Sequence, residues 1–186
     1  MTTVKQTKKM SAADVVLVGA LIAAGAVLRL FCPPIFGITP NFLILMYCVA
    51  ILIIKPNLRQ TIGIAFVAAA VSHFTTKSMI PYLNFVSEPI GALVVYSLVN
   101  GLSALKISKF TFKPFVVTLF GTLASGLTYV TVLKTLILFV NTPKNPAFLA
   151  LLTVVITTAV INSVLAQLIY YPIVAASGKK LDPVTT

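Results

Sequence analysis

Glu88 is the residue whose type and position point most directly to chemistry. The chain holds three acidic residues, of which Asp14 and Asp182 lie near its two ends, whereas Glu88 borders a long apolar run. A carboxylate at the centre of a membrane-spanning helix costs roughly 2.5–3.5 kcal/mol, so such a residue usually has a partner. We expect Glu88 to accept a hydrogen bond or a charge from the amine of a ligand. The alternative is an acid at a helix start that faces water or pairs with Lys77, stabilised by the helix dipole.

Further polar side chains near the ends of apolar runs complete the predicted ligand-binding set: Arg29, Asn41, His73, Lys77, Asn84 and Tyr129. Arg29 is expected to extend toward lipid headgroups, with a ligand carboxylate as the alternative partner. His73 is the only histidine, and Cys32 and Glu88 are its only plausible co-ligands, so we predict a structural hydrogen bond and no metal site. The polar run 75–78 is either an ordinary loop or a lid over a ligand.

Catalytic constellations are missing from the sequence. It shows no carboxylate pair, nucleophile–base pair or cluster of metal ligands. Gly121 and Gly126 have the spacing that begins a phosphate-binding loop, but Leu127 stands where that motif requires lysine. We therefore predict a protein that binds a small molecule and is not an enzyme, with no cofactor in this chain. If ATP drives its action, the ATPase must reside on another polypeptide.

The composition is that of a membrane protein. Hydrophobic residues make up 59% of the 186 positions, charged residues only 9%, and the mean hydropathy is +1.05. A soluble domain carries about 25% charged residues. The net charge of +11 comes from short basic clusters between apolar runs, which are typical of topology signals in a lipid bilayer. Nucleic acid is not expected as a partner.

The apolar runs predict an all-α membrane protein, a compact bundle of six transmembrane helices. A helix needs about 20 residues to cross the hydrocarbon core, with a range of roughly 17–25. The predicted helices cover residues 14–30, 41–54, 59–75, 88–104, 114–138 and 146–176. The second is short, so we expect it to tilt or to be covered by a loop. We predict one domain over 1–186, with a basic N-terminus (1–13) and a short tail (177–186).

The distribution of Lys and Arg predicts the orientation of the bundle. One side of the membrane would hold Lys5, Lys8, Lys9, Lys55, Arg59, Lys106, Lys109, Lys113, Lys179 and Lys180, and the other Arg29, Lys77, Lys134 and Lys144. The positive-inside rule then places both termini in the cytoplasm. All the candidate ligand-binding residues fall at the opposite, outer face. We expect a multi-pass protein of the plasma membrane.

Small and amide side chains predict how the helices pack. Gly19, Ala20, Ala23 and Ala24 form two overlapping pairs at four-residue spacing, which lets another helix approach closely. This face packs either inside the bundle or against an external partner. Asn162 and Gln167 lie deeper in the last helix, where hydrogen bonds between helices are the expected role.

Several stretches together resemble the substrate-capture (S) components of energy-coupling-factor (ECF) transporters, and most of all the tryptophan-transporter family. The stretches are 34–47 (PIFGITPNFLILMY), 62–76 (ending SHFTT), 80–84 (IPYLN), 121–126 (GTLASG) and 160–173 (VINSVLAQLIYYPI). In that family an acid usually stands at the position of Asn41 and another near Ser87 or Glu88. This chain keeps only the second acid, a departure that bears on the ligand more than on the fold.

The resemblance implies an S component that captures a small aromatic nutrient, tryptophan first, at the outer face. An indole would stack on Phe or Tyr side chains, with its amine toward Glu88 and its carboxylate toward Lys77 or Arg29. A transmembrane scaffold (T) subunit and two ATPase (A) subunits would complete the transporter, with the face around Ala20 and Ala24 on the scaffold. Alternatives are an S component for a vitamin or vitamin precursor (hydroxymethylpyrimidine or thiamine, pyridoxine, riboflavin) and a stand-alone secondary transporter.

Overall fold

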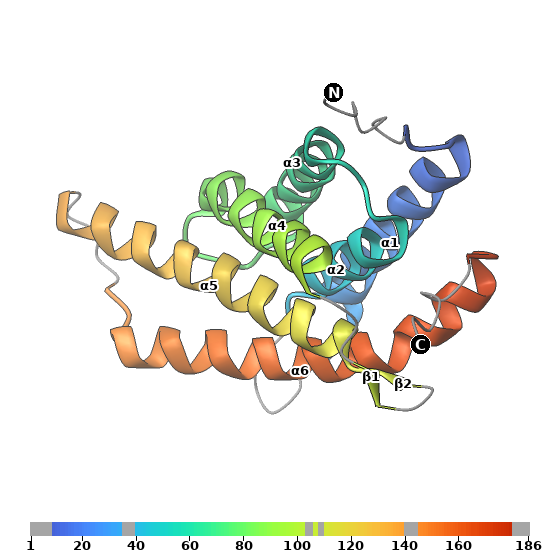
Figure 1. The fold of residues 1–186 in the computed structure, drawn as a ribbon. Coiled ribbons are helices and arrows are strands. Elements are labelled where there is room, and N and C mark those ends of the chain that lie inside the picture. Colours follow the sequence, from blue (N-terminus) through green and yellow to red (C-terminus); the bar gives the residue numbers. More distant parts are fainter. Residues whose placement is uncertain (1–8, 35–39, 103–105, 108–109, 140–144, 180–186) are drawn as a thin grey trace, which may run out of the picture.

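The computed structural model describes residues 9–34, 40–102, 106–107, 110–139 and 145–179, which form a helical bundle (Figure 1). The helices in this part of the chain are α1 (Ala12–Phe31), α2 (Phe42–Ile54), α3 (Leu58–Thr75), α4 (Asn84–Gly101), α5 (Lys113–Phe139) and α6 (Phe148–Ala176), with a 3-10 turn, η1 (Pro81–Leu83), ahead of α4. The predicted all-helical class with six helices is confirmed.

Helix α4 begins earlier than predicted. The prediction started it after Ser87, whereas the helix begins at Asn84, directly after η1. Pro81 occupies the first position of η1, where its fixed φ favours a helical start and its missing N–H costs nothing. The side-chain amide of Asn84 donates to the Pro81 carbonyl oxygen at 2.7 Å and stabilises the junction. Glu88 therefore lies in the second turn of α4, inside the bundle.

A short hairpin that the sequence did not predict precedes α5. Strands β1 (Lys106–Ile107) and β2 (Phe110–Thr111) pair antiparallel. Gln167 Nε2 donates to the carbonyl oxygen of Thr111 at 2.8 Å, and the Tyr171 hydroxyl accepts from the Thr111 N–H at 2.8 Å. Gln167 Oε1 also accepts from the N–H of Phe115 in α5 at 3.3 Å. The predicted interhelical role of Gln167 is confirmed, and α6 holds the hairpin in place.

Helix α2 is the centre of the bundle. It contacts all five other helices, and of its 13 residues all but Ile53 are buried. A helix that is apolar all round is typical of such a fully enclosed position. At its C-terminus Lys55 adopts the left-handed conformation (φ 51°) and Pro56 follows, which ends the helix sharply. Within the described residues α2 is therefore enclosed by neighbouring helices, and the predicted cover by a loop stays a prediction, since residues 35–39 lie outside the described chain.

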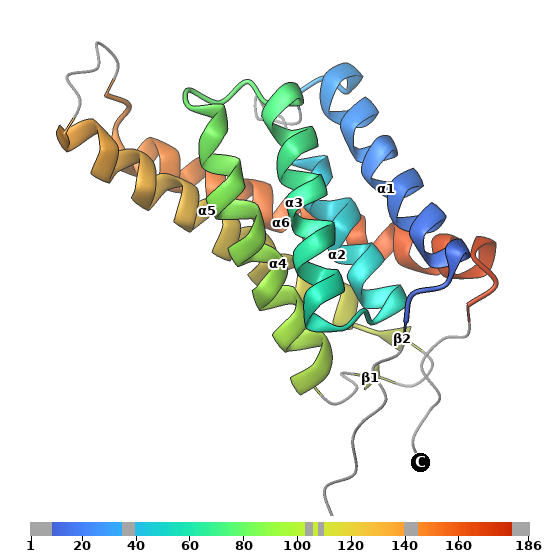
Figure 2. The ribbon, with the colours of Figure 1, turned by 90° about the horizontal axis from the view of Figure 1, so that it is seen from above.

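The other helices surround α2 and expose apolar side chains on their outer faces. Figure 2 shows α1, α3 and α4 side by side, with α5 and α6 running across them. Four helical spans are long and apolar enough to cross a membrane: Ala12–Phe31, Pro81–Gly101, Lys113–Phe139 and Phe148–Ala176. Helix α3 is less apolar because Arg59, Gln60 and His73 lie near its ends. Large exposed apolar side chains on the outer helices fit a lipid environment better than water.

Two glycines allow α4 and α5 to approach closely behind the central helix. A methyl group on Gly91 would lie 2.7 Å from the Tyr47 hydroxyl and 2.8 Å from Ser125 Cβ. A methyl group on Gly121 would lie 2.4 Å from Val95 Cγ2. Small residues at a helix crossing are typical of membrane bundles. This contact brings α2, α4 and α5 together around one buried carboxylate, which is described below.

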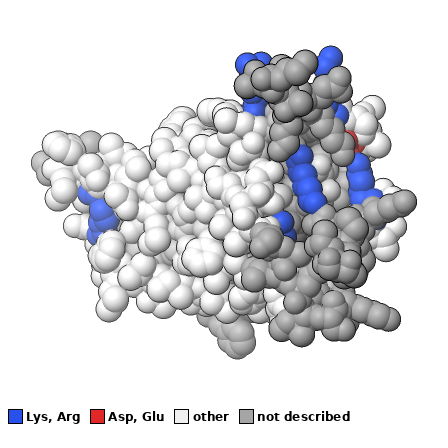
Figure 3. Space-filling view, viewed as in Figure 1, with Lys and Arg blue, Asp and Glu red and all other residues white. Residues whose placement is uncertain are grey.

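The two ends of the described chain meet at one end of the bundle. Asp14 completes a capping box with Ser11 at the start of α1 and pairs with Lys179, which follows α6. On the face in Figure 3, Lys and Arg lie toward the left tip and over the right-hand part, and the wide area between them carries no charged residue. Other predicted positions lie outside the described residues: Lys5, Lys8, Lys109, Lys144, Lys180, Asp182 and the predicted helix end at Ala104.

Candidate functional site

A cavity of about 380 Å³ opens at the end of the bundle where α1 ends and α4 begins. Its size falls within the roughly 300–1,000 Å³ typical of small-molecule sites. Its lining residues are far apart in the sequence, from Arg29 in α1 to Thr158 in α6. Five of the seven predicted ligand-binding residues line it: Arg29, Asn41, Asn84, Glu88 and Tyr129. Because consecutive helices run in opposite directions, the end of one helix and the start of the next lie at the same end of the bundle.

Glu88 is buried and held by four neutral hydrogen-bond donors. Its side chain is 1% exposed. Oε2 accepts from the hydroxyls of Tyr47 at 3.1 Å and Ser125 at 3.2 Å, and Oε1 accepts from Ser72 at 3.2 Å and the Asn41 amide at 3.3 Å. A carboxylate has about four acceptor positions, so all of them are used. The alternative in which Glu88 faces water or pairs with Lys77 is wrong.

Arg29 turns inward and shares two partners with Glu88. Its Nη1 donates to Asn41 Oδ1 at 3.2 Å and to Ser72 Oγ at 3.0 Å, and its Nη2 donates to Thr76 Oγ1 at 2.8 Å. Asn41 and Ser72 thus each accept from the guanidinium and donate to the carboxylate. The expectation that Arg29 extends to lipid headgroups is wrong, because this half-buried charge is held by fixed polar partners.

The guanidinium of Arg29 keeps donors for a ligand. An arginine carries five N–H donors, and three bond to the side chains just named. Within the described part of the chain, Nε–H and the second hydrogen of Nη2 have no partner. Arg29 lines the cavity, so these donors suit a ligand carboxylate, which guanidinium groups bind in a forked geometry.

A second part of the cavity lining, formed by α5, α6 and Pro146 ahead of α6, is mainly apolar. Its aliphatic members are Val130, Leu133, Pro146, Leu151, Val154 and Val155. Gly126 lies against Val155, where an added methyl group would approach Val155 Cγ1 to 2.7 Å. Tyr129 is the aromatic side chain in this lining. The cavity therefore combines one charged, hydrogen-bonded wall with one apolar wall.

The polar run after α3 forms part of the cavity rim. Thr76 and Ser78 line the cavity and are joined by a hydroxyl–hydroxyl bond of 2.8 Å. The Tyr129 hydroxyl accepts from the Ile80 N–H at 3.2 Å and donates to the Ile80 carbonyl oxygen at 3.4 Å. Two residues of this run thus border the cavity, and its role as a lid over a ligand stays a prediction.

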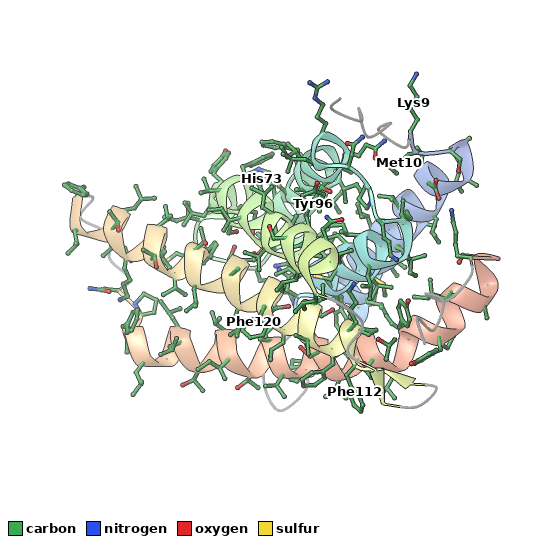
Figure 4. All side chains as sticks on the ribbon, in the orientation of Figure 1. Lys9, Met10, His73, Tyr96, Phe112 and Phe120 are labelled. Atoms are coloured by element: carbon green, nitrogen blue, oxygen red, sulfur yellow. The ribbon has the colours of Figure 1, made fainter. Side chains whose placement is uncertain are left out.

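Two predicted ligand-binding residues, Lys77 and His73, do not line the cavity. Lys77 is exposed. His73 lies at the periphery of the helices (Figure 4), where its ring packs against Phe74, Tyr82 and Phe85 at centroid distances of 5.1, 4.6 and 5.9 Å. Its Nδ1 is buried without a partner among the described residues. The hydrogen bond predicted for His73 is not found among the described residues, and its ring packs against aromatic neighbours there.

The small-residue face of α1 packs against nothing within the described chain. Gly19, Ala20, Ala23 and Ala24 are all exposed, and a methyl group on Gly19 would meet no atom within 4 Å. The close approach of α1 to α2 occurs instead at Gly25, where an added methyl group would lie 2.9 Å from the Phe42 carbonyl oxygen. Internal packing is therefore not the role of this face.

Sequence reasoning missed three of the four donors that surround Glu88. Tyr47, Ser72 and Ser125 lie inside apolar or small-residue stretches. A residue with a hydroxyl group in such a stretch is usually interpreted as part of the helix packing. The sequence signal for these donors was Glu88, the one acidic residue away from the two chain ends. A buried carboxylate requires donors from neighbouring helices. Asn162, predicted to bond across helices, does so: its Nδ2 donates to the Asn41 carbonyl oxygen at 3.1 Å.

Comparison with protein-family models adds the decisive observation. The model of the tryptophan transporter TrpP family matches residues 11–179, which include every described helix. This chain belongs to that family. No curated protein sequence and no solved structure matches it.

Membership in the TrpP family confirms the resemblance to tryptophan transporters drawn from the sequence. A transporter family implies a membrane and a transported substrate, in agreement with the four long apolar helices. In the TrpP-family chain the cavity of about 380 Å³ is the natural candidate for a substrate site, because it combines an apolar wall with a few convergent polar groups.

Replacing Tyr47 with Phe should destabilise the protein by about 1–3 kcal/mol, because Glu88 Oε2 loses one of its two donors inside the bundle. The apparent Tm of the purified protein in detergent measures this effect. Tyr82→Phe is the matched control, since that ring is 69% exposed, and it should leave Tm essentially unchanged. Equal losses in the two variants would show that the Tyr47 hydroxyl does not support the carboxylate.

Proposed function

We propose that this chain is the substrate-binding S component of an ECF-type importer and captures tryptophan at the outer face of the plasma membrane. The observation that carries the proposal is the two-sided cavity in a chain of the tryptophan transporter family. One wall offers charged groups for an amino acid backbone, and the other offers an apolar surface for a large ring. A binding subunit needs such a site and no catalytic group.

The charged wall suits a zwitterion. The Arg29 N–H groups that have no partner among the described residues bind the substrate carboxylate, and the carboxylate of Glu88 attracts the ammonium group. Because four donors already surround Glu88, the ammonium group replaces one of them. The Asn41 amide is the longest of the four contacts at 3.3 Å and is the one to be displaced. One cation and one anion leave the wall neutral, as a zwitterionic ligand requires.

The apolar wall suits the indole ring. An aromatic side chain buries about 150–250 Å², which at about 25 cal/mol per Å² contributes about 4–6 kcal/mol. Tyr129 supplies an aromatic contact, and Gly126 and Val155, which lie against each other, add apolar surface for the ring. Aliphatic packing thus replaces most of the aromatic stacking expected from the sequence.

The partners follow from the exposed small-residue face of α1. We assign this face, around Ala20 and Ala24, to contact with a T subunit, while two A subunits hydrolyse ATP. Close contact through glycine and alanine is a typical way for membrane helices to associate. The face lies in the middle of α1, ahead of Arg29 in the last turn, so docking and substrate binding use different parts of one helix.

Purified protein should bind L-tryptophan, and Glu88→Gln should weaken binding at least tenfold, because it removes the partner of the ammonium group and leaves Arg29 uncompensated. The chain contains no tryptophan, so fluorescence excited at the red edge of indole absorption reports only the ligand. Lys77→Gln, an exposed position, is the control and should bind normally. Preference for pyridoxine, riboflavin or a thiamine precursor over tryptophan would refute this ligand assignment.

The cavity end should face the outside of the cell. In a background with Cys32→Ser and Cys48→Ala, a membrane-impermeant maleimide should label Lys77→Cys in intact cells. Lys9→Cys, at the other end of the bundle, should react only after the cells are broken. The reverse pattern would place the cavity on the cytoplasmic side and exclude capture from outside.

Gly19→Leu should abolish co-purification with the T and A subunits while leaving tryptophan affinity intact, because its side chain enlarges only the exposed face of α1. Gly63→Leu on α3 is the matched control, since a methyl group there also meets nothing within 4 Å. It should co-purify normally. Tryptophan uptake by vesicles that contain this chain alone would instead identify a secondary transporter.

A further inference from the structure

Two threonines interrupt the apolar wall of the cavity. Thr122 in α5 and Thr158 in α6 both line it, although their side chains are only 2% and 7% exposed. Buried hydroxyls normally have partners, since an unsatisfied polar group is destabilising. The two other hydroxyls of this wall are already engaged, Ser125 with Glu88 and Tyr129 with Ile80. The hydrogen bonds available to the two threonines therefore affect which ligands the cavity can bind.

Asn162 lies behind these threonines and has an acceptor without a donor. Its side chain is 0% exposed. Its Nδ2 donates to the Asn41 carbonyl oxygen at 3.1 Å and to Thr122 Oγ1 at 3.4 Å, which fixes the orientation of the amide. Its Oδ1 has no partner among the described residues. A buried amide oxygen with no donor indicates that a donor is supplied in another state of the site.

Thr158 is the residue that can supply this donor. It lies four positions before Asn162 on α6, so the two side chains occupy the same face of the helix, one turn apart. Its hydroxyl makes no hydrogen bond with any residue that the structure describes. A hydroxyl carries one donor and two acceptor positions. In the structure the two groups are not bonded; a Thr158 hydroxyl that turns toward Asn162 Oδ1 when a ligand binds would donate to it and still accept a hydrogen bond from the cavity.

We propose that Thr158, positioned by Asn162, accepts a hydrogen bond from a ring N–H of the ligand and so selects ligands whose ring carries that group. The inference deepens the proposed function and rests on it. The charged groups of the amino acid are held at the wall of Arg29 and Glu88, which leaves the ring against α5 and α6. An indole N–H is a donor only, and Thr158 is the hydroxyl of that wall that bonds no described residue, whereas Thr122 already accepts from Asn162.

The test compares L-tryptophan with 3-(3-benzothienyl)-L-alanine, whose sulfur replaces the ring N–H in a ring of nearly the same shape. Isothermal titration calorimetry of the purified full-length chain gives both affinities. The wild-type protein should prefer tryptophan by roughly tenfold or more, because a site that hydrogen-bonds an N–H discriminates strongly against an analogue without it. Equal affinities for the two ligands would overturn the inference while leaving the proposed function intact.

Substitutions at Thr158 assign the preference to its hydroxyl. Thr158→Val keeps the shape and should reduce the preference to about twofold or less, mainly by weakening tryptophan binding. Thr158→Ser restores a hydroxyl and should retain the preference. Thr153→Val is the matched control, since Thr153 is exposed on the same helix and bonds the Leu149 carbonyl oxygen. A Thr158→Val protein with the wild-type preference would overturn the inference.

Asn162→Leu tests the positioning role. It removes Oδ1 and should lower the preference for tryptophan over the benzothienyl analogue, a ratio that a general loss of stability does not change. If this variant fails to fold, Thr158→Val decides the matter alone. Failure of the wild-type protein to bind tryptophan at all would instead refute the proposed function, and the inference with it.

Discussion

The structure depends on holding one buried negative charge and one half-buried positive charge in the same place. Removing either partner of a buried pair leaves an uncompensated charge, which typically costs about 3–5 kcal/mol. Glu88 and Arg29 avoid this cost because Asn41 and Ser72 bond both of them, and Tyr47 and Ser125 satisfy the remaining oxygen. The six residues come from five consecutive helices or their caps. The requirement to satisfy one carboxylate thus fixes the register of α1 to α5 relative to one another.

Helix α6 contacts this network only through Asn162, which among the described residues donates to the Asn41 carbonyl oxygen, and that division shapes the cavity. It contributes Leu151, Val154, Val155 and Thr158 to the lining and pairs with α5 along most of its length. In Figure 1 the α5–α6 pair extends beyond the other helices. The charged wall is therefore rigidly specified by hydrogen bonds, whereas the apolar wall is specified by shape. An amphipathic ligand with a polar head and a large ring matches both.

The sequence was sufficient to predict the helices and the main residues of the charged wall of the site. Apolar runs bounded by Cys32-Pro33-Pro34, Lys55-Pro56 and Pro146 determined most helix limits within a few residues, because proline and charge stop membrane helices wherever they occur. The start of α4 was misplaced, since η1 converts a polar loop into helix. Arg29, Asn41, Asn84 and Glu88 were recognised because charge and amide groups are rare in such a chain. Tyr47, Ser72, Ser125 and Thr158 were not, since a hydroxyl in an apolar run gains its role only from neighbours that periodicity cannot specify.

The complete enclosure of α2 constrains how the protein is assembled. Ribosomes deliver the N-terminus first, so α2 enters the bilayer before four of the five helices that later cover it. During that interval its surroundings are acyl chains, which its nearly unbroken aliphatic surface tolerates. Tyr47 is the main polar group that α2 exposes to the acyl chains, until α4 inserts and brings Glu88. The negative charge of Glu88 therefore enters the bilayer only with α4. By then the first three helices have already supplied most of the donors that surround it.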